Sequence, residues 1–163
     1  MLRIRMICVG ALSEEYWRAA AAEYKKRLSG MCVFEELRLR EVRVGKSGHA
    51  PSEAEIKDAL DMEALAIMSA VPKRALLVSL CVEGKRYTSP GLSELIERAA
   101  SEGRSDICFV IGSSYGLSDK VKEASDVRLS MSDLTFPHQL ASVMLMEAIY
   151  RALDIARGGK YHK

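Results

Sequence analysis

The sequence predicts an α/β fold: a single domain, residues 1–163, with a mostly parallel sheet and helices on both faces. Strand-length apolar segments alternate with capped or amphipathic segments of helical length along the whole chain, in the order βαβαβαβαβα. Two of the apolar segments, 75–82 and 106–111, are almost continuously apolar, which is typical of parallel strands covered on both faces. The length of 163 residues suits one domain with a substantial core.

The first strand is expected over residues 2–9, where charged and apolar residues alternate. A helix should follow, with Ser13 as its N-cap, two glutamates that complement the helix dipole, and an end near Leu28 before Gly30. Residues 33–42 are expected to form a second strand. Its moderate polarity indicates a place near an edge of the sheet.

Residues 43–51, RVGKSGHAP, combine three basic side chains with two glycines and a proline, which predicts a loop. Such a loop could be a flap that contacts phosphate or a solvated connector, and both interpretations fit the sequence. Ser52 and Glu55 then form a capping box, and apolar residues at helical spacing predict a helix to about Ala70.

Residues 75–82 should form the third strand, and a polar loop, 83–88, is expected to leave it. Ser89 is the expected cap of the next helix, because Pro90 follows at the first helical position and Gly103 stands past the end.

The fourth strand, 106–111, ends in GSSYG at 112–116, where glycine permits close approach of the backbone to a ligand, although an ordinary turn would look the same. Ser118 should cap a short helix through Ala124. The last strand is expected over 126–129, and Pro137 should take the first position of a closing helix that ends near Arg157.

Three loops leave the carboxyl ends of the last three predicted strands, after Leu80, at Gly112 and at 131–136. If these strands are neighbours, the loops converge into one crevice, the usual ligand site of α/β proteins. The sequence has no GxGxxG after the first strand, no P-loop, no GxSxG and no metal-spaced His/Cys/Asp set. The sequence therefore does not indicate dinucleotide binding, a P-loop nucleotide site, the nucleophile of an α/β-hydrolase or a metal site.

The composition and charge of the chain limit the kinds of partner that we expect. The net charge of +2 predicts no strong field for nucleic acid, so RNA binding would depend on local basic patches, oligomerisation or substrate shape. The apolar runs are too short to cross a bilayer and no signal peptide is evident, so we expect a cytoplasmic protein without a membrane partner. The four cysteines lack paired spacing, and we expect buried thiols.

His138 stands at the start of the closing helix, where the helix dipole favours a neutral ring able to accept a proton; it could equally be a polar helix-start residue. Glu147 and Arg151 stand four apart, as in a helix-stabilising ion pair. Apolar residues cover more of this helix than one core face needs, which indicates a subunit interface. The tail 158–163, GGKYHK, would ordinarily fray, yet its glycines would also let it swing onto a site.

Three separated segments together resemble the RlmH family of the SPOUT superfamily of methyltransferases: GKRYTSPGL at 84–92, FVIGSSYGLS at 109–118 and LTFPHQLASVMLMEAIYRALDIARGGKYHK at 134–163. The resemblance covers essentially the whole chain. It implies S-adenosylmethionine-dependent methylation at N3 of a pseudouridine in 23S ribosomal RNA of the assembled ribosome. It also implies a homodimer and a trefoil-knotted C-terminal half.

The resemblance further implies site residues. The cofactor would lie against Leu80, Gly112, Met131, Ser132, Asp133, Leu134, Thr135 and Phe136. The polar positions near the reacting base would be His138, Arg151, Tyr161 and His162, with the tail reaching the partner's site. Relatives usually carry two glycines after the fourth strand, whereas this chain has Gly112 followed by Ser113, a residue type that resists positive φ.

For the mechanism, we expect His138 or His162 to handle the imide proton, and Arg151 and Lys160 to hold phosphate or to stabilise the developing anion. Candidate RNA phosphate contacts elsewhere are Arg3, Arg5, Arg43 and Lys46. Two other functions stay open: a noncatalytic RNA-binding or ribosome-associated module of the same fold, and a SPOUT methyltransferase that acts on tRNA.

Overall fold

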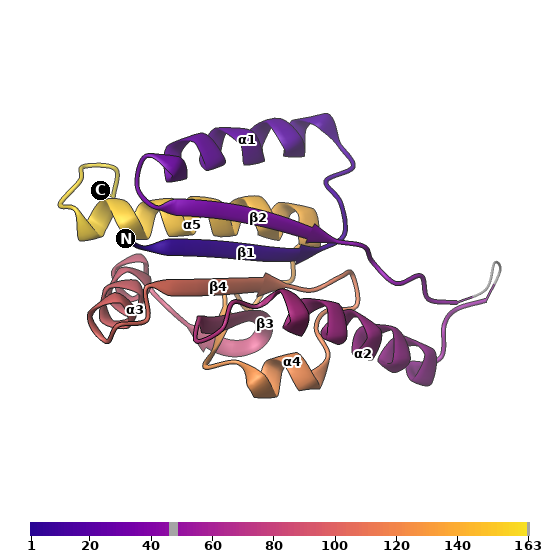
Figure 1. Cartoon of the computed structure of the whole chain (residues 1–163). Helices are drawn as coiled ribbons and strands as arrows, with labels where there is room; N and C mark the ends of the chain where they lie inside the picture. Colours follow the sequence, from indigo (N-terminus) through magenta and orange to yellow (C-terminus); the bar gives the residue numbers. More distant parts are fainter. Residues whose placement is uncertain (46–48, 163) are drawn as a thin grey trace.

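The structure, a computed structural model, describes residues 1–45 and 49–162 (Figure 1). Strands and helices alternate strictly, as the sequence predicts. The elements are β1 (Arg3–Val9), α1 (Glu15–Ser29), β2 (Val33–Leu39), α2 (Glu53–Ala70), β3 (Leu76–Arg86), α3 (Ser89–Ser101), β4 (Asp106–Ile111), α4 (Asp119–Ala124), β5 (Val127–Ser130) and α5 (His138–Ala156). None of the helices described is both long enough and apolar enough to span a membrane.

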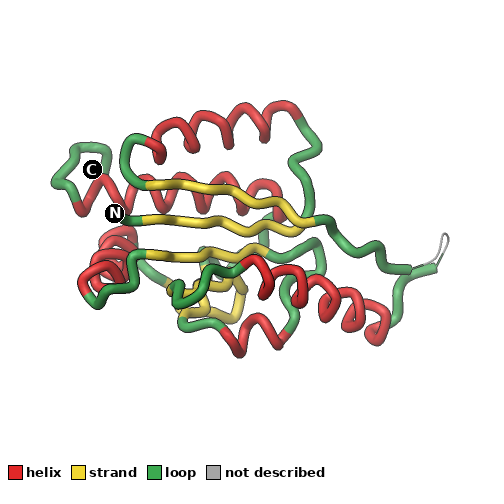
Figure 2. Tube along the Cα trace, viewed as in Figure 1, coloured by secondary structure: helices red, strands yellow, loops and turns green. Residues whose placement is uncertain are grey.

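The five strands form one sheet in the order β2-β1-β4-β3-β5, and every neighbouring pair is parallel. Helices flank this sheet (Figure 2). α5 packs against α1 and α3 on one face, whereas α2 and α4 pack together on the other. The α/β class, the helices on both faces and the edge position of β2 are therefore confirmed.

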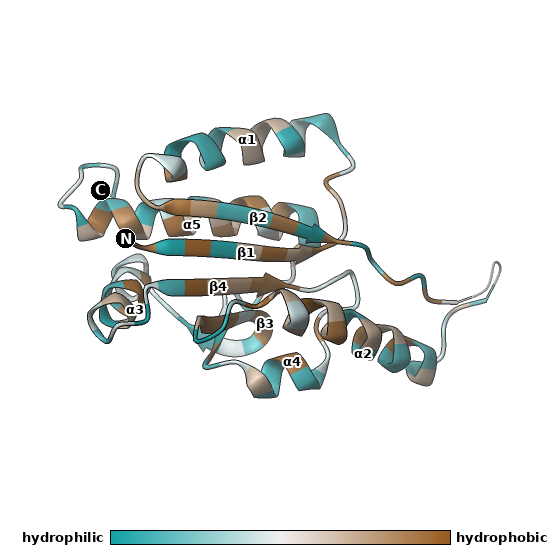
Figure 3. Cartoon of the chain, viewed as in Figure 1, coloured by the Kyte–Doolittle hydropathy of each residue, from teal (hydrophilic) through white to brown (hydrophobic). Residues whose placement is uncertain are grey.

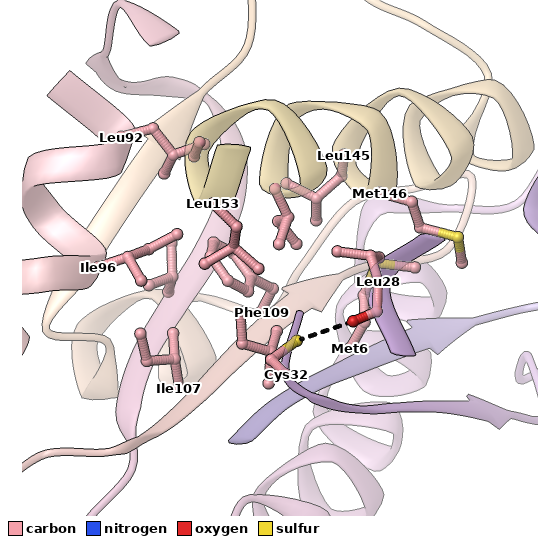
Figure 4. Packing of buried hydrophobic residues seen from close by; sticks show 14 of the residues in the cluster. Met6, Leu28, Cys32, Leu92, Ile96, Ile107, Phe109, Leu145, Met146 and Leu153 are labelled. Carbon is pink, nitrogen blue, oxygen red and sulfur yellow. Dashed lines mark hydrogen bonds between the residues drawn. The ribbon is translucent and has the colours of Figure 1, made fainter. Parts of the chain in front are cut away.

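The core consists of two apolar clusters, one on each face of the sheet. β1 supplies both, because alternate side chains of a strand point to opposite faces: Met6 belongs to the cluster under α1, α3 and α5, and Ile7 to the cluster under α2 and α4. β4, between β1 and β3, is hydrophilic only at its start (Figure 3). Its Phe109 is fully buried in the cluster that Leu145 and Leu153 of α5 close (Figure 4).

Three predicted helix starts differ from the structure. Ser13 does not cap α1; its amide donates to Gln139 Oε1 at 2.8 Å, so this serine ties the β1–α1 connection to α5. Thr88 rather than Ser89 caps α3, with its hydroxyl accepting from the amide of Gly91 at 3.1 Å. Pro137 is the N-cap of α5 and not its first residue. The capping box of α2 and the Ser118 cap of α4 are confirmed.

The expected loop 83–88 is wrong, because β3 continues to Arg86. Both Leu80 and Lys85 pair with Leu129 of β5, so the turn between them bulges out and returns to the same strand. A Cβ at Gly84 would lie 2.7 Å from the carbonyl oxygen of Arg128, which shows how closely the two backbones approach. The return strand depends on this tertiary contact and carries no apolar pattern of its own.

β2 ends at Leu39, earlier than the predicted Val42. Its pairing with β1 stops where Val9 meets Leu39, so the following residues have no strand beside them. The amide of Val42 instead donates to the Glu63 carboxylate of α2 at 2.9 Å. The chain thus leaves the sheet and turns toward α2.

Candidate functional site

A pocket of about 560 Å³ lies beside the bulge in β3 and the ends of β4 and β5. The predicted convergence of the three loops is therefore confirmed. The lining residues are Leu80–Glu83, Ile111–Leu117, Lys122, Leu129–Ser132, Leu134–His138 and Ala141. Apolar side chains stand exposed at its rim, among them Val82, Tyr115 and Leu134, a feature typical of binding sites.

Most residues that the resemblance assigns to the cofactor line this pocket: Leu80, Gly112, Met131, Ser132, Leu134, Thr135 and Phe136. Asp133 stands on the same loop, but its side chain is exposed and accepts a 2.6 Å hydrogen bond from Arg86. Ser132 shapes the loop, because its hydroxyl accepts from the amide of Leu134 at 3.0 Å.

The turn after β4 has no room for a side chain at its first position. A Cβ on Gly112 would lie 2.0 Å from the carbonyl oxygen of Gly116. The amide of Gly116, at φ +89°, donates back to the carbonyl of Ser113 at 2.9 Å. Among the described residues other than glycine, only Arg74 has a positive φ, so Ser113 fits its backbone position without strain.

Two carboxylates hold this turn from outside the pocket. The hydroxyl of Ser113 donates to Glu63 at 2.9 Å, and the hydroxyl of Ser114 donates to Glu41 at 2.7 Å. Burial raises the pKa of Glu63 above its ordinary value, while the hydrogen bonds from Val42 and Ser113 oppose that rise. The turn is thereby linked to α2 and to the β2–α2 connection.

The sequence reasoning missed the side of the pocket formed by Cys81, Val82, Glu83 and Lys122. Lys122 of α4 lies 2.6 Å from the Glu83 carboxylate, and this contact holds the pKa of Glu83 below its ordinary value. The bulge in β3 brings Glu83 to this place. No short-range pattern could have signalled it.

His138 lies in the pocket wall at the first turn of α5. Gly10, at φ +93°, stands directly beside it: a Cβ there would lie 2.9 Å from His138 Nε2. Arg38 donates both to the carbonyl of Gly10 and to the hydroxyl of Ser142 on α5, each at 3.1 Å. The end of β1 and the start of α5 are thus fixed relative to each other.

The other predicted polar residues lie at the far end of α5. At about 1.5 Å of rise per residue, Arg151 is roughly 20 Å along the helix from His138. Arg151 pairs with Glu147, which also accepts a 3.1 Å hydrogen bond from the Tyr161 hydroxyl. Burial raises the pKa of Tyr161 to about 12. His162 is exposed, so one chain by itself does not bring the four residues together.

Between these two ends, α5 presents an apolar surface. A shallow groove of about 260 Å³ is lined by Tyr24, Met131, Val143, Met144, Glu147 and Ala148. Its position between the pocket loop and the Glu147–Arg151 pair is where the sequence predicts a subunit interface.

The remaining basic candidates differ in surroundings. Arg3 and Arg5 belong to β1 and are paired with Asp106 and Glu35. Arg43 is exposed, and Lys46 lies outside the described residues.

Cys8, Cys32 and Cys108 are buried and Cys81 is half-buried. Burial raises the pKa of the Cys8 and Cys108 thiols to about 12. Residues 1–45 and 49–162 contain no group of three or more His, Cys, Asp or Glu side chains arranged to hold a metal ion.

Comparison with known proteins covers nearly the whole chain. Residues 2–162 match the family described as "Predicted SPOUT methyltransferase". The chain is 41% identical over 162 residues to "Ribosomal RNA large subunit methyltransferase H" of Streptococcus thermophilus (strain CNRZ 1066), which covers 99% of this chain and 100% of the relative. Proteins of the same name from Bacillus pumilus and Streptococcus uberis are each 40% identical with the same coverage.

Proposed function

Because the chain belongs to the RlmH (ribosomal RNA large subunit methyltransferase H) family of SPOUT methyltransferases, we propose that it transfers a methyl group from S-adenosylmethionine to N3 of a pseudouridine in 23S ribosomal RNA of the assembled ribosome. Residues 1–163 form one catalytic domain that works in the cytoplasm. The observation that carries the proposal is the pocket formed by the β3 bulge and the loops after β4 and β5, in a chain that matches the family over residues 2–162.

The pocket suits S-adenosylmethionine in size and chemistry. Its volume of about 560 Å³ falls within the usual range of small-molecule sites. Leu80, Ile111 and Leu129 offer apolar walls for a flat ring, while the backbone of the turn after β4 and of residues 130–134 offers polar groups. When bound, the cofactor supplies a methyl group already activated on a sulfonium. Membership of the SPOUT superfamily also implies a trefoil-knotted C-terminal half.

The protein's own task is then to position the base and to remove its proton, because an imide nitrogen must lose its N–H to accept a methyl group. His138, in the pocket wall, or His162, on the tail, handles that proton. Arg151 and Lys160 hold phosphate or stabilise the negative charge that develops on the imide.

The distribution of these residues supports a homodimer. His138 lies at one end of α5 and Arg151 and Tyr161 at the other, with the apolar groove between them. An isologous contact along this face would place the far end of one α5, with its tail, beside the partner's pocket. Each active site then combines one chain's His138 and cofactor pocket with the other chain's Arg151, Tyr161 and His162.

Nucleoside mass analysis of ribosomal RNA from a strain lacking this protein tests the function. We expect 3-methylpseudouridine in 23S RNA to be lost and to return on complementation. Unchanged 23S RNA together with a missing methyl group in tRNA would favour the tRNA enzyme. A purified protein that binds no S-adenosylmethionine in calorimetry would favour the noncatalytic module.

A further inference from the structure

Glu63 of α2 is the only charged residue of the described chain that is buried as a whole, with 4% of its surface exposed. Within that part of the chain no Lys or Arg pairs with it, although a buried carboxylate is costly without compensation. Both of its oxygens accept hydrogen bonds instead. A buried carboxylate of this kind is expected where its hydrogen bonds fix the position of the segments that donate to it.

The two bonds come from different loops. Oε1 accepts from the amide of Val42, which belongs to the β2–α2 connection, and Oε2 accepts from the hydroxyl of Ser113, each at 2.9 Å. Ser113 is itself 6% exposed and belongs to the turn that lines the pocket. Glu63 thus bridges a segment outside the pocket to the pocket wall.

A second bond of the same kind lies beside it. The hydroxyl of Ser114 donates to Glu41 Oε1 at 2.7 Å. Two connections therefore join the β2–α2 segment to the turn after β4. Glu41 bonds directly to Ser114, and Val42 is linked to Ser113 through Glu63. The hydroxyl groups make these bonds, so a glycine at position 113 could not make the one to Glu63.

We propose that Glu63 is a positioning residue for the methyl-donor pocket and that it acts through Ser113, by holding the Gly112–Ser114 turn in the conformation that receives the cofactor. This inference rests on the proposed function. A positioning role predicts an effect on cofactor affinity, whereas a purely structural role predicts an effect on stability alone.

Ser118 supplies a matched control. Its hydroxyl donates to Asp61 of α2 at 2.6 Å, so it also joins a serine after β4 to an α2 carboxylate, but Ser118 does not line the pocket. Ser113→Ala removes a bond to an α2 carboxylate at a residue that lines the pocket, whereas Ser118→Ala removes such a bond, together with the cap of α4, at a residue that does not line it.

The test is isothermal titration calorimetry of the full-length variants with S-adenosylmethionine, with thermal unfolding measured in parallel. We expect Ser113→Ala to raise the Kd by about three- to tenfold, the range expected for the loss of one ordinary hydrogen bond, and Ser118→Ala to lower the melting temperature without changing the Kd. The methyl-transfer rate of Ser113→Ala should be reduced most at low cofactor concentration and should rise as the cofactor concentration is raised, because the change acts on cofactor affinity.

The role of Glu63 is tested with a conservative variant, Glu63→Gln, and with a double variant that combines Glu63→Ala and Ser113→Ala. Glu63→Gln keeps an acceptor for Val42 and a group that can bond Ser113, so its Kd should stay near that of the unaltered protein, whereas Glu63→Ala should raise it. In the Glu63→Ala background, Ser113→Ala should have no further effect on the Kd.

Equal Kd values for the unaltered protein and Ser113→Ala would overturn the positioning role and leave the proposed function standing. Absence of binding by the unaltered protein would overturn both. Fully additive effects of Glu63→Ala and Ser113→Ala on the Kd would also contradict the inference, because the two residues would then act separately.

Discussion

Gly112→Ala perturbs the turn after β4, which we propose holds the cofactor, at a point where the structure leaves no room for a side chain. The new Cβ would lie 2.0 Å from the carbonyl oxygen of Gly116, more than an ångström closer than the 3.4 Å at which ordinary contact begins. Both atoms belong to the tight turn, so the backbone itself must move. That movement would break the 2.9 Å bond from the Gly116 amide to Ser113.

The magnitude follows from these two effects. Overpacking costs about 1–3 kcal/mol and the lost backbone hydrogen bond about 1 kcal/mol, so the free energy of unfolding should fall by roughly 2–4 kcal/mol. Because the same turn lines the pocket, we expect the affinity for S-adenosylmethionine to fall by at least about tenfold.

Urea unfolding and calorimetry measure the two quantities on the same preparation. Gly30→Ala is the control, since Gly30 has φ −79° and its nearest neighbour would lie 3.5 Å from a Cβ. This change should alter stability by less than about 1 kcal/mol and should not affect cofactor binding. If Gly112→Ala were as harmless as Gly30→Ala, the assignment of this turn to the cofactor site would be refuted.

Three further predictions concern the proton, the shared site and pH. Replacing the histidine that handles the proton, His138 or His162, by alanine should lower the single-turnover rate by about a hundredfold or more; wild-type rates for both variants would contradict the proposal. If His138→Ala is the inactive histidine variant, mixing it with inactive Arg151→Ala protein should restore about a quarter of the activity when each site uses both chains, since half the dimers then carry one intact site, and none when each site uses one chain. Arg104 donates to Asp126 and holds the pKa of that carboxyl below its ordinary value, so its stabilisation is present above about pH 4 and is lost as pH falls through the lower folded pKa. Asp126→Asn should therefore cost about 1 kcal/mol at pH 7 and progressively less under acid in urea titrations, and a difference that does not change with pH would contradict this.

The elements of the fold could be predicted from the sequence because their signals are local. The apolar runs of β3 and β4 and the capping box at Ser52 each lie within a few residues. The return limb of β3 was missed because its polar residues are placed by β5, and close packing at Gly84 is visible only in the folded chain. Ser13 was misassigned as a cap because Gln139, its partner, is distant in sequence.

The candidate site could be predicted from the sequence only where its signals are local. Its three loops follow predicted strands, and the motifs of the family lie in them. The Glu63–Ser113 bond joins residues fifty positions apart and has no sequence pattern. The distance between His138 and Arg151 likewise required the helix between them, and it is consistent with the prediction that the tail reaches the partner's site.

Methyl transfer by the purified protein tests the central claim most directly. The protein, S-adenosylmethionine labelled in its methyl group and assembled ribosomes that lack the modification are incubated together, and the labelled nucleosides are identified by mass spectrometry. We predict label only in 3-methylpseudouridine from 23S RNA. No transfer, or label in another nucleoside or in tRNA, would contradict the account.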